Sequence, residues 1–278
     1  AAGISLGPVV NINEDSAFEF AKRWGAATWG TDPKLLLEDD VIAVHVCTPP
    51  NLHYEMVKFL LENKKHVLCE KPLCLEPWQA KELVELAQKK ERICAVNLNV
   101  RYHPACQRAR QVVSEPDFGR ILLIHGTYLQ EFHALPEPLG WRYNEELAGQ
   151  MKAVTEIGTH WLDLAEYISG KRIERLSALF GCYYPTRFVE NGMMYPDSLD
   201  GKRKEIKVTS EDSALIHFYF EDGALGSVVL SEVSQGRMNH LSIEITGANK
   251  NLWWNSEQST ELHTAKKGAG VNTELFTF

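Results

Sequence analysis

Strand-like and helix-like patterns of apolar residues alternate along the first hundred residues. Short apolar strings such as VIAVHVC at 41–47 are typical of parallel strands buried on both faces. The segment that follows has Leu52, Met56 and Phe59 at helical spacing. We expect strands at 8–12, 41–47, 66–69 and 93–98, and helices at 16–24, 51–63 and 78–90. This alternation predicts βαβ units and a parallel sheet of the Rossmann type.

The pattern changes after about residue 118. A helix at 103–113 leads into a strand at 120–129, a loop rich in Pro and Trp, and a helix at 156–168. From residue 173 onward the chain consists of strand-like segments, among them SALIHFYF at 213–220, whose alternation is typical of an antiparallel sheet covered on one face. The sequence therefore predicts an α/β domain at 1–118 and, at 119–278, an α+β domain with a large open, mainly antiparallel sheet.

Composition narrows the class of protein. The 278 residues are 44% apolar and 24% charged, which is typical of globular domains and excludes disordered and coiled-coil classes. The net charge of −8 argues against a nucleic-acid partner, and no apolar run approaches the roughly 20 residues of a membrane helix. Six cysteines form no CxxC pair, and no signal peptide is visible. We therefore expect a cytoplasmic protein with reduced thiols and no membrane partner.

Two polar segments follow neighbouring strands of the predicted sheet. The first, TPPNLH at 48–53, offers amides and a hydroxyl that could bind phosphate or ribose, although the same pattern is typical of a plain helix cap. The second contains Glu70 and Lys71. Ligands of doubly wound sheets bind at the carboxyl ends of strands, so a lysine there could donate to a substrate hydroxyl. A lone lysine, however, is more often a solvated side chain.

The helix predicted at 156–168 carries a third candidate. Glu156, His160 and Asp163 form a stripe beside its apolar face, and a carboxylate one turn from an imidazole can orient a general base. A packed histidine with a capping glutamate fits the same residues. Metal binding is not expected, because the ten histidines are scattered and Glu156 and His160 supply only two ligands.

Six segments, in their order along the whole chain, resemble the glucose–fructose oxidoreductase / inositol dehydrogenase (Gfo/Idh/MocA) family. They are TPPNLHYE (48–55), CEKPL (69–73), NLNVRYHP (97–104), WRYNEELAGQ (141–150), EIGTHWLDL (156–164) and SQGRMNHLSIEITG (234–247). The resemblance implies that the first domain is a Rossmann domain for a nicotinamide dinucleotide. It implies that the second is an open-faced sheet often used for oligomer contacts.

The resemblance also implies roles for single residues. Lys71 resembles the family's lysine that contacts both substrate hydroxyl and nicotinamide, and His160 resembles its catalytic histidine. Glu156 stands where the family usually has aspartate, and its extra methylene could move a substrate contact by about an ångström. The positions that resemble the family's cofactor neighbours are Thr48, Pro49, Asn51, His53, Glu70, Lys71 and Asn99, with Trp141 and Arg142 as a further pair from the sugar-oxidoreductase branch.

The beginning of the chain departs from the family pattern. The opening strand and its GxGxxG turn are missing, because residues 8–12 align with the family's second strand. We therefore expect the first strand of the sheet to lie outside this sequence, whose ends look trimmed. Asn11 stands where the family has an acidic residue that binds the adenosine ribose, and an amide there fits either NAD or NADP.

The leading hypothesis is an NAD(P)-dependent oxidoreductase acting on a sugar or polyol. His160 would take the hydroxyl proton while hydride leaves the same carbon for nicotinamide, Lys71 would polarise the oxygen, and Glu156 would position substrate and imidazole. An NAD-dependent glycoside hydrolase of the same family is one alternative. A non-catalytic sugar-binding or regulatory protein is another, if the glycine-rich turn is truly absent. We also expect a homo-oligomer, dimer or tetramer, because few helices are available to cover the second sheet.

Overall fold

The chain forms two compact units that divide after Asn97. The computed structural model describes residues 3–198 and 203–277. Helix α4 (Pro104–Ser114) belongs to the second unit, because its Ala105 and Ala109 share a hydrophobic core with Trp161. The division therefore lies before the boundary that we expected after residue 118. The apolar face of α4 decides which core the helix joins, and the alternating pattern alone does not show this.

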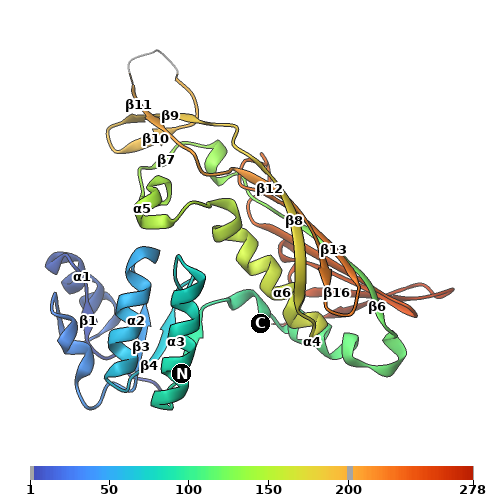
Figure 1. The fold of residues 1–278 in the computed structure, drawn as a ribbon, viewed down its shortest axis with the longest axis horizontal. Coiled ribbons are helices and arrows are strands. Elements are labelled where there is room, and N and C mark those ends of the chain that lie inside the picture. The colour runs from blue at the N-terminus through green and yellow to red at the C-terminus, as the bar shows by residue number, and fades with distance from the viewer. Residues whose placement is uncertain (1–2, 199–202, 278) are drawn as a thin grey trace. The chain divides into compact units, whose positions relative to one another are not determined.

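The first unit contains parallel strands in two sheets, ordered β1-β2 and β3-β4-β5 (Figure 1). Val46 is paired with Cys69, and Cys69 with Val96, so the segments after these strands leave from the same edge of the sheet, as the sequence predicted. The strands are β1 (Val9–Val10), β2 (Trp29–Gly30), β3 (Ala43–Val46), β4 (His66–Cys69) and β5 (Cys94–Val96).

Helices of the first unit begin and end at recognisable capping residues. The Asn13 side chain caps the first of them, Gly25 ends it at φ 77°, and Glu76 with Gln79 forms a capping box before the third. Val46, Leu60 and Leu83 lie in the buried core. The helices are α1 (Glu14–Trp24), α2 (His53–Glu62) and α3 (Pro77–Lys90), with short 3₁₀ turns η1 (Pro33–Leu37) and η2 (Pro50–Leu52).

An eight-stranded sheet dominates the second unit, with the order β17-β16-β15-β14-β6-β13-β12-β8. All neighbours are antiparallel except β13 and β6, so the predicted mainly antiparallel sheet is confirmed. In 213–220 the residues Ala214, Ile216 and Phe218 are buried while their neighbours are not, as the alternation predicted. The strands are β6 (Ile121–Leu129), β8 (Ile173–Gly181), β12 (Ser213–Phe220), β13 (Leu225–Ser231), β14 (His240–Gly247), β15 (Lys250–Asn255), β16 (Glu261–Lys266) and β17 (Val271–Leu275).

Helices α4 and α6 (Thr159–Ser169) pack on the buried face of this sheet (Figure 1). Trp161 of α6 is fully buried, and its ring nitrogen donates to the backbone oxygen of Ser242 at 2.8 Å. The close approach requires Gly126 on the neighbouring strand, because a Cβ there would collide with that same oxygen. No helix in the described ranges is long and apolar enough to cross a membrane.

Helix α6 does not begin as the sequence predicted. A π-helical turn, η7 (Val154–Gly158), precedes it, and the Thr159 amide donates to the carbonyl of Val154, five residues back. Glu156 therefore lies in a widened turn, and its offset from His160 is not that of one regular α-helical turn. π-helical turns of this kind occur mostly as single insertions in helices, and often at functional sites.

A smaller, four-stranded sheet, in the order β11-β9-β10-β7, was not predicted. Its strands are short and mix charged with apolar residues, so they show no clear period. They are β7 (Glu137–Pro138), β9 (Thr186–Glu190), β10 (Met193–Tyr195) and β11 (Lys204–Lys207). Short helical turns complete this unit: η3 (Asn99–Tyr102), η4 (Pro116–Phe118), η5 (Phe132–Ala134), η6 (Trp141–Tyr143), α5 (Glu145–Ala148) and η8 (Ser256–Gln258).

Candidate active site

Two buried oxygens at the edge of the first sheet lack a hydrogen-bond partner among the described residues. They are Oγ1 of Thr48, just after β3, and Oδ1 of Asn51 in η2. Burying such groups costs free energy unless a partner satisfies them. A sugar hydroxyl can donate to the amide oxygen and either donate to or accept from the threonine hydroxyl. The pair therefore fits the ribose of a dinucleotide, and Pro49, between strand and helix, shapes the loop.

His53 joins the two loops that carry the first-unit candidates. Its side chain is fully buried, with Nδ1 2.7 Å from the carbonyl oxygen of Pro72 and Nε2 2.7 Å from that of Thr48. Both ring nitrogens thus face backbone, and the ring ties the Thr48 loop to the loop of Lys71. We expected His53 among the cofactor neighbours, and here it holds the loops on which other candidates lie.

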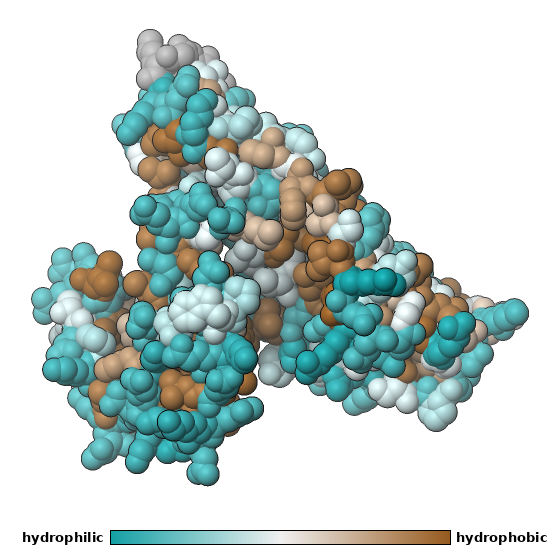
Figure 2. All heavy atoms as spheres, viewed as in Figure 1, coloured by the Kyte–Doolittle hydropathy of each residue, from teal (hydrophilic) through white to brown (hydrophobic). Residues whose placement is uncertain are grey.

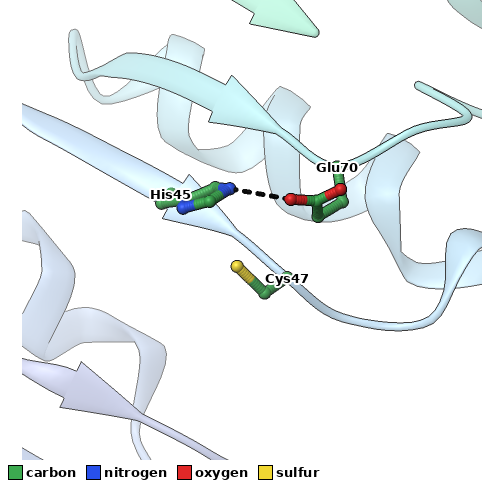
Figure 3. A group of neighbouring side chains, drawn as sticks. All are labelled: His45, Cys47 and Glu70. Carbon is green, nitrogen blue, oxygen red and sulfur yellow. Dashed lines mark hydrogen bonds and ion pairs between the residues drawn. The ribbon is translucent and has the colours of Figure 1, made fainter. Parts of the chain in front are cut away.

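Glu70 lies just after β4 and is bound from both neighbouring strands. Its Oε1 lies 3.3 Å from Nε2 of His45 and accepts from Nδ2 of Asn97 at 2.7 Å. Figure 3 shows Glu70 facing His45 and Cys47 from the adjacent strand. These three side chains could surround a metal ion, since their ligand atoms lie within 4.8 Å of one another. Burial and the charge of Glu70 raise the pKa of the Cys47 thiol, however, which disfavours the thiolate that a metal needs.

The remaining predicted cofactor neighbours lie on both units. Asn11 follows β1, is exposed, and its Oδ1 accepts from the Asn13 amide at 3.0 Å. Lys71 is half-buried and follows β4 in the first unit. Asn99 is exposed at the start of η3 in the second unit. Trp141 is half-buried, and the guanidinium group of Arg142 lies 4.8 Å from its ring centre.

Arginines bind both carboxylates of the stripe that we predicted around His160. Nε of Arg142 lies 2.7 Å from Oε1 of Glu156. Asp163 forms a two-point ion pair with Arg101 of η3, and this hydrogen bonding raises the pKa of the guanidinium group. Asp163 is therefore used to hold η3 against α6. Glu156 and His160 are both half-buried at the start of the helix, in the same unit as Arg142.

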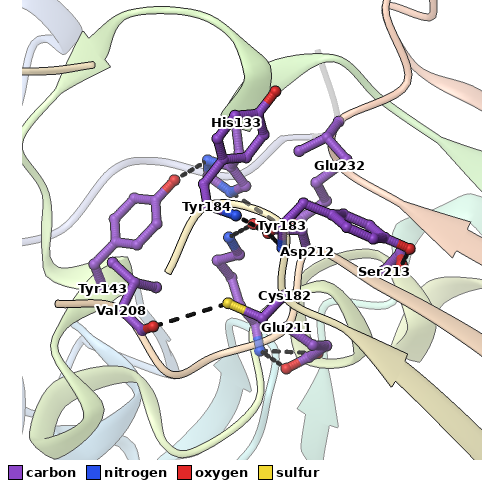
Figure 4. Close-up of polar contacts among 12 residues, drawn as sticks. His133, Tyr143, Cys182, Tyr183, Tyr184, Val208, Glu211, Asp212, Ser213 and Glu232 are labelled. Atoms are coloured by element: carbon purple, nitrogen blue, oxygen red, sulfur yellow. Dashed lines mark hydrogen bonds and ion pairs between the residues drawn. The ribbon is translucent and has the colours of Figure 1, made fainter. Parts of the chain in front are cut away.

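Sequence reasoning missed a cluster of buried polar residues that lies beside Glu156. Figure 4 shows His133, Tyr143, Asp212 and Glu232 of this cluster. At its centre His133 of η5 has Nδ1 2.7 Å from Oε1 of Glu137 and Nε2 3.3 Å from Oε2 of Glu232. The Tyr143 hydroxyl donates to the same Glu137 oxygen at 2.7 Å. One ring nitrogen of His133 and one carboxylate oxygen each of Glu156 and Glu232 lie within 4.8 Å of one another. The cluster thus borders the candidate catalytic carboxylate.

A second buried ion pair extends this cluster. Nζ of Lys152 lies 2.7 Å from Oδ1 of Asp212, and both side chains are fully buried. Arg187 of β9 lies 3.5 Å from the same Asp212 oxygen and also donates a 2.7 Å hydrogen bond to the backbone oxygen of His133. Glu211 accepts from the backbone amides of residues 152 and 154, which caps the turn that carries Glu156.

The pKa values of this cluster follow from its pairing. Burial alone would raise the pKa of Glu137, but hydrogen bonds from His133 and Tyr143 and the charge of Arg187 hold it below its usual value. Burial would likewise raise the pKa of Asp212, but Lys152 and the backbone amides of Tyr183 and Tyr184 together lower it. Burial and Glu137 raise the pKa of Tyr143, which keeps its hydroxyl protonated. Glu137 and Asp212 are therefore ionised at neutral pH. No motif or spacing connects these positions in the sequence.

Comparison with known proteins gives matches in both units. A family model described as "Oxidoreductase family, NAD-binding Rossmann fold" matches residues 4–98, and the GFO/IDH/MocA C-terminal domain matches residues 106–252. Levoglucosan dehydrogenase of Pseudarthrobacter phenanthrenivorans is 32% identical over 263 residues, which are 92% of this chain and 66% of that protein. Myo-inositol 2-dehydrogenase of Thermotoga maritima is 28% identical over 221 residues, which are 79% of this chain and 59% of that protein.

The fold matches solved structures equally well. A structure of levoglucosan dehydrogenase in complex with NADH and L-sorbose has a TM-score of 0.89 at 30% identity, covering 97% of this chain and 71% of that one. The first four curated relatives are longer than this chain, which spans 66%, 53%, 56% and 47% of their lengths. The chain thus corresponds to about half to two thirds of these relatives.

Proposed function

Because the chain belongs to the Gfo/Idh/MocA family of oxidoreductases, we propose that it is an NAD- or NADP-dependent dehydrogenase that oxidises a hydroxyl carbon of a sugar or polyol. The observation that carries the proposal is the pair of buried, unsatisfied oxygens of Thr48 and Asn51 at the carboxyl edge of the first sheet. Relatives named for levoglucosan and myo-inositol support the substrate class.

The proposed cofactor is a nicotinamide dinucleotide, which supplies the hydride acceptor when bound. Thr48 and Asn51 would bind its hydroxyl groups, on a loop that His53 holds. Asn11 would face the adenosine ribose, and because an amide neither attracts nor repels a 2′-phosphate strongly, we retain both NAD and NADP. Glu70 and Asn97 would fix the edge of the sheet from which Lys71 extends. By the family resemblance, Asn99, Trp141 and Arg142 are also proposed as cofactor neighbours.

The proposed chemistry uses three side chains. His160 takes the proton from the substrate hydroxyl, and Lys71 donates a hydrogen bond to the same oxygen, which stabilises its developing negative charge. Glu156 orients the substrate and the imidazole. Its pairing with Arg142 supports this role, because a carboxylate held at 2.7 Å keeps a fixed direction.

The test is turnover by the purified chain. It is supplied with NAD⁺ or NADP⁺ and a panel that includes levoglucosan, myo-inositol and alkyl glucosides, and reduced nicotinamide is followed by its absorbance. We expect net reduction with at least one substrate. Cleavage of a glucoside without net reduction would instead identify an NAD-dependent glycoside hydrolase. Sugar binding with neither reaction would identify a non-catalytic binding or regulatory protein.

We also propose that the chain forms a homo-oligomer, a dimer or tetramer, through its large sheet. The outer face of β8, β12 and β13 exposes large apolar side chains, and Figure 2 shows hydrophobic residues along these strands. These are Leu179, Leu215, Tyr219, Leu225 and Val229. Light scattering should return a multiple of the chain mass at micromolar concentration, and a monomer would contradict the proposal.

We propose a cytoplasmic location for the protein. All six cysteines are free thiols, which is typical of proteins in a reducing compartment.

A further inference from the structure

We propose that His133 is a positioning residue for Glu156, and that its ring supplies a buried positive charge that fixes the direction of this carboxylate. The inference rests on the proposed function, in which Glu156 orients the substrate. It starts from one observation: a ring nitrogen of His133 and carboxylate oxygens of Glu156 and Glu232 meet within 4.8 Å.

The His133 ring is held from several directions. Its two nitrogens face the carboxylates of Glu137 and Glu232, at 2.7 and 3.3 Å. Its backbone amide donates to the carbonyl of Glu232 at 2.9 Å, and its own carbonyl accepts from Arg187 at 2.7 Å. The doubly protonated ring carries an N–H on each nitrogen, so it is the form that suits two facing carboxylates. A ring fixed in this way can orient a neighbouring group without moving itself.

The charges around Glu156 show what His133 contributes. The carboxylates that meet here are Glu156 in η7, Glu137 in β7 and Glu232 just after β13, and the hydroxyl is that of Tyr143 in η6. The guanidinium groups are Arg142, at 2.7 Å from Glu156, and Arg187, at 3.8 Å from Glu137. If the His133 ring were neutral, these three carboxylates would face only two positive charges, those of Arg142 and Arg187. A positive His133 balances the set and attracts the Glu156 carboxylate.

The same donor atoms could in principle bind a divalent cation, because an imidazole and two carboxylates form a common ligand set. Arg142 already occupies one oxygen of Glu156, and Arg187 lies on the other side of the cluster. The positive charge that a metal would bring is therefore supplied by side chains. This distinction makes metal content one of the outcomes of the test.

The first experiment is His133→Gln, which keeps a polar side chain and removes the charge. We expect kcat/KM for the sugar to fall roughly ten- to hundredfold, the loss typical of a misplaced catalytic contact. In the pH profile of kcat/KM, the rising limb should move to higher pH, because a nearby positive charge has been lost. The Kd for the dinucleotide should not change. The matched control is His240→Gln, since His240 also pairs with a carboxylate, Glu257 at 2.9 Å, but lies outside the cluster. It should leave the pH profile unmoved.

A double-mutant cycle separates positioning from general damage. If His133 acts through Glu156, adding His133→Gln to Glu156→Gln should cost little more than Glu156→Gln alone. Additive losses, or an unmoved pH profile in His133→Gln, would overturn the inference. A normal rate in Glu156→Gln would instead refute the proposed role of Glu156 itself.

Two further measurements complete the test. If His133→Gln does not fold, Glu232→Gln removes the facing charge with little change of shape and enters the same cycle, with the same non-additivity expected. Metal analysis of the wild-type chain after incubation with Zn²⁺ or Mn²⁺ should give no stoichiometric binding that depends on Glu232. Such binding would mean that a metal ion, and not the His133 ring, supplies the positive charge beside Glu156, and it would overturn the inference.

Discussion

The two units hold their polar site residues in opposite ways. In the first unit, short side chains lie on loops that follow consecutive strands, and buried oxygens of Thr48 and Asn51 have no partner in the described chain. In the second, long charged side chains such as Arg187 and Lys152 are fully buried and bound several times over. On the proposed function, a bound dinucleotide would supply the missing partners in the first unit, whereas the charged groups of the second unit are held by one another.

The comparison is tested most strongly at Lys71. Lys71→Ala should lower kcat by orders of magnitude and leave the melting temperature nearly unchanged, because the residue lies at a strand end and outside the core. Steady-state kinetics and thermal unfolding of the same preparation check both halves of this prediction. A variant that retains a near wild-type kcat would remove Lys71 from the mechanism.

The two units also differ in how far their sites could be predicted from the sequence. Parallel strands bring their carboxyl ends to one edge, so chain order alone was enough to associate the Thr48 loop with Glu70 and Lys71. His133, Arg187 and Glu232 come from separate segments about fifty residues apart, and only the folded second unit brings them together. Periodicity could not reveal them, because each lies in a short turn or strand.

The start of α6 shows a subtler limit. The segment EIGTHWLDL has the apolar spacing of a regular helix, and the stripe was predicted on that basis. The amides of residues 152 and 154, at the start of the widened turn, donate instead to Glu211, which lies 59 and 57 residues further along the chain. A capping residue so distant in sequence leaves no local signal.

The buried pair of the second unit should matter far more to stability than a surface pair of the first. Lys152→Met leaves Asp212 buried without its main counter-charge, which typically costs about 3–5 kcal/mol. Lys58→Met breaks an ion pair with Glu82 that is open to solvent, and should change the melting temperature little. Chemical and thermal unfolding of both variants measure the contrast. Equal melting temperatures in the two variants would contradict it.

Acid should weaken the second unit before the first. The pKa values of Asp212 and Glu137 are lowered in the folded state, from ordinary values of 3.8 and 4.5. Their stabilising contribution is therefore complete above those ordinary values and is lost as the pH falls through the lower, folded pKa values. Hydrogen exchange with mass spectrometry, run between neutral pH and about pH 3, reads the two units separately. Asp212→Asn should make the acid loss in the second unit shallower, and an unchanged slope would show that other groups cause it.

The smallest expected effect concerns the Thr48 hydroxyl, whose oxygen has no hydrogen-bond partner among the described residues of the first unit. Thr48→Val removes a hydroxyl without a partner, so the free protein should be as stable as wild type or slightly more stable. Binding of the dinucleotide should weaken about tenfold, the typical worth of one hydrogen bond. Fluorescence titration with NADH measures the change in affinity, and thermal unfolding measures the change in stability. A loss of stability with unchanged affinity would mean that the hydroxyl serves the fold.

The place of β6 in the large sheet affects how the chain folds during synthesis. β6 is paired on one side with β13 and on the other with β14, both about a hundred residues later in the chain. The strands of the first unit pair with near neighbours, so that unit can assemble while the ribosome is still adding residues. The apolar segment ILLIHGTYL must wait for both partners with open edges. The second unit is therefore the slow and aggregation-prone step, and its yield should depend on chaperones and temperature more than that of the first.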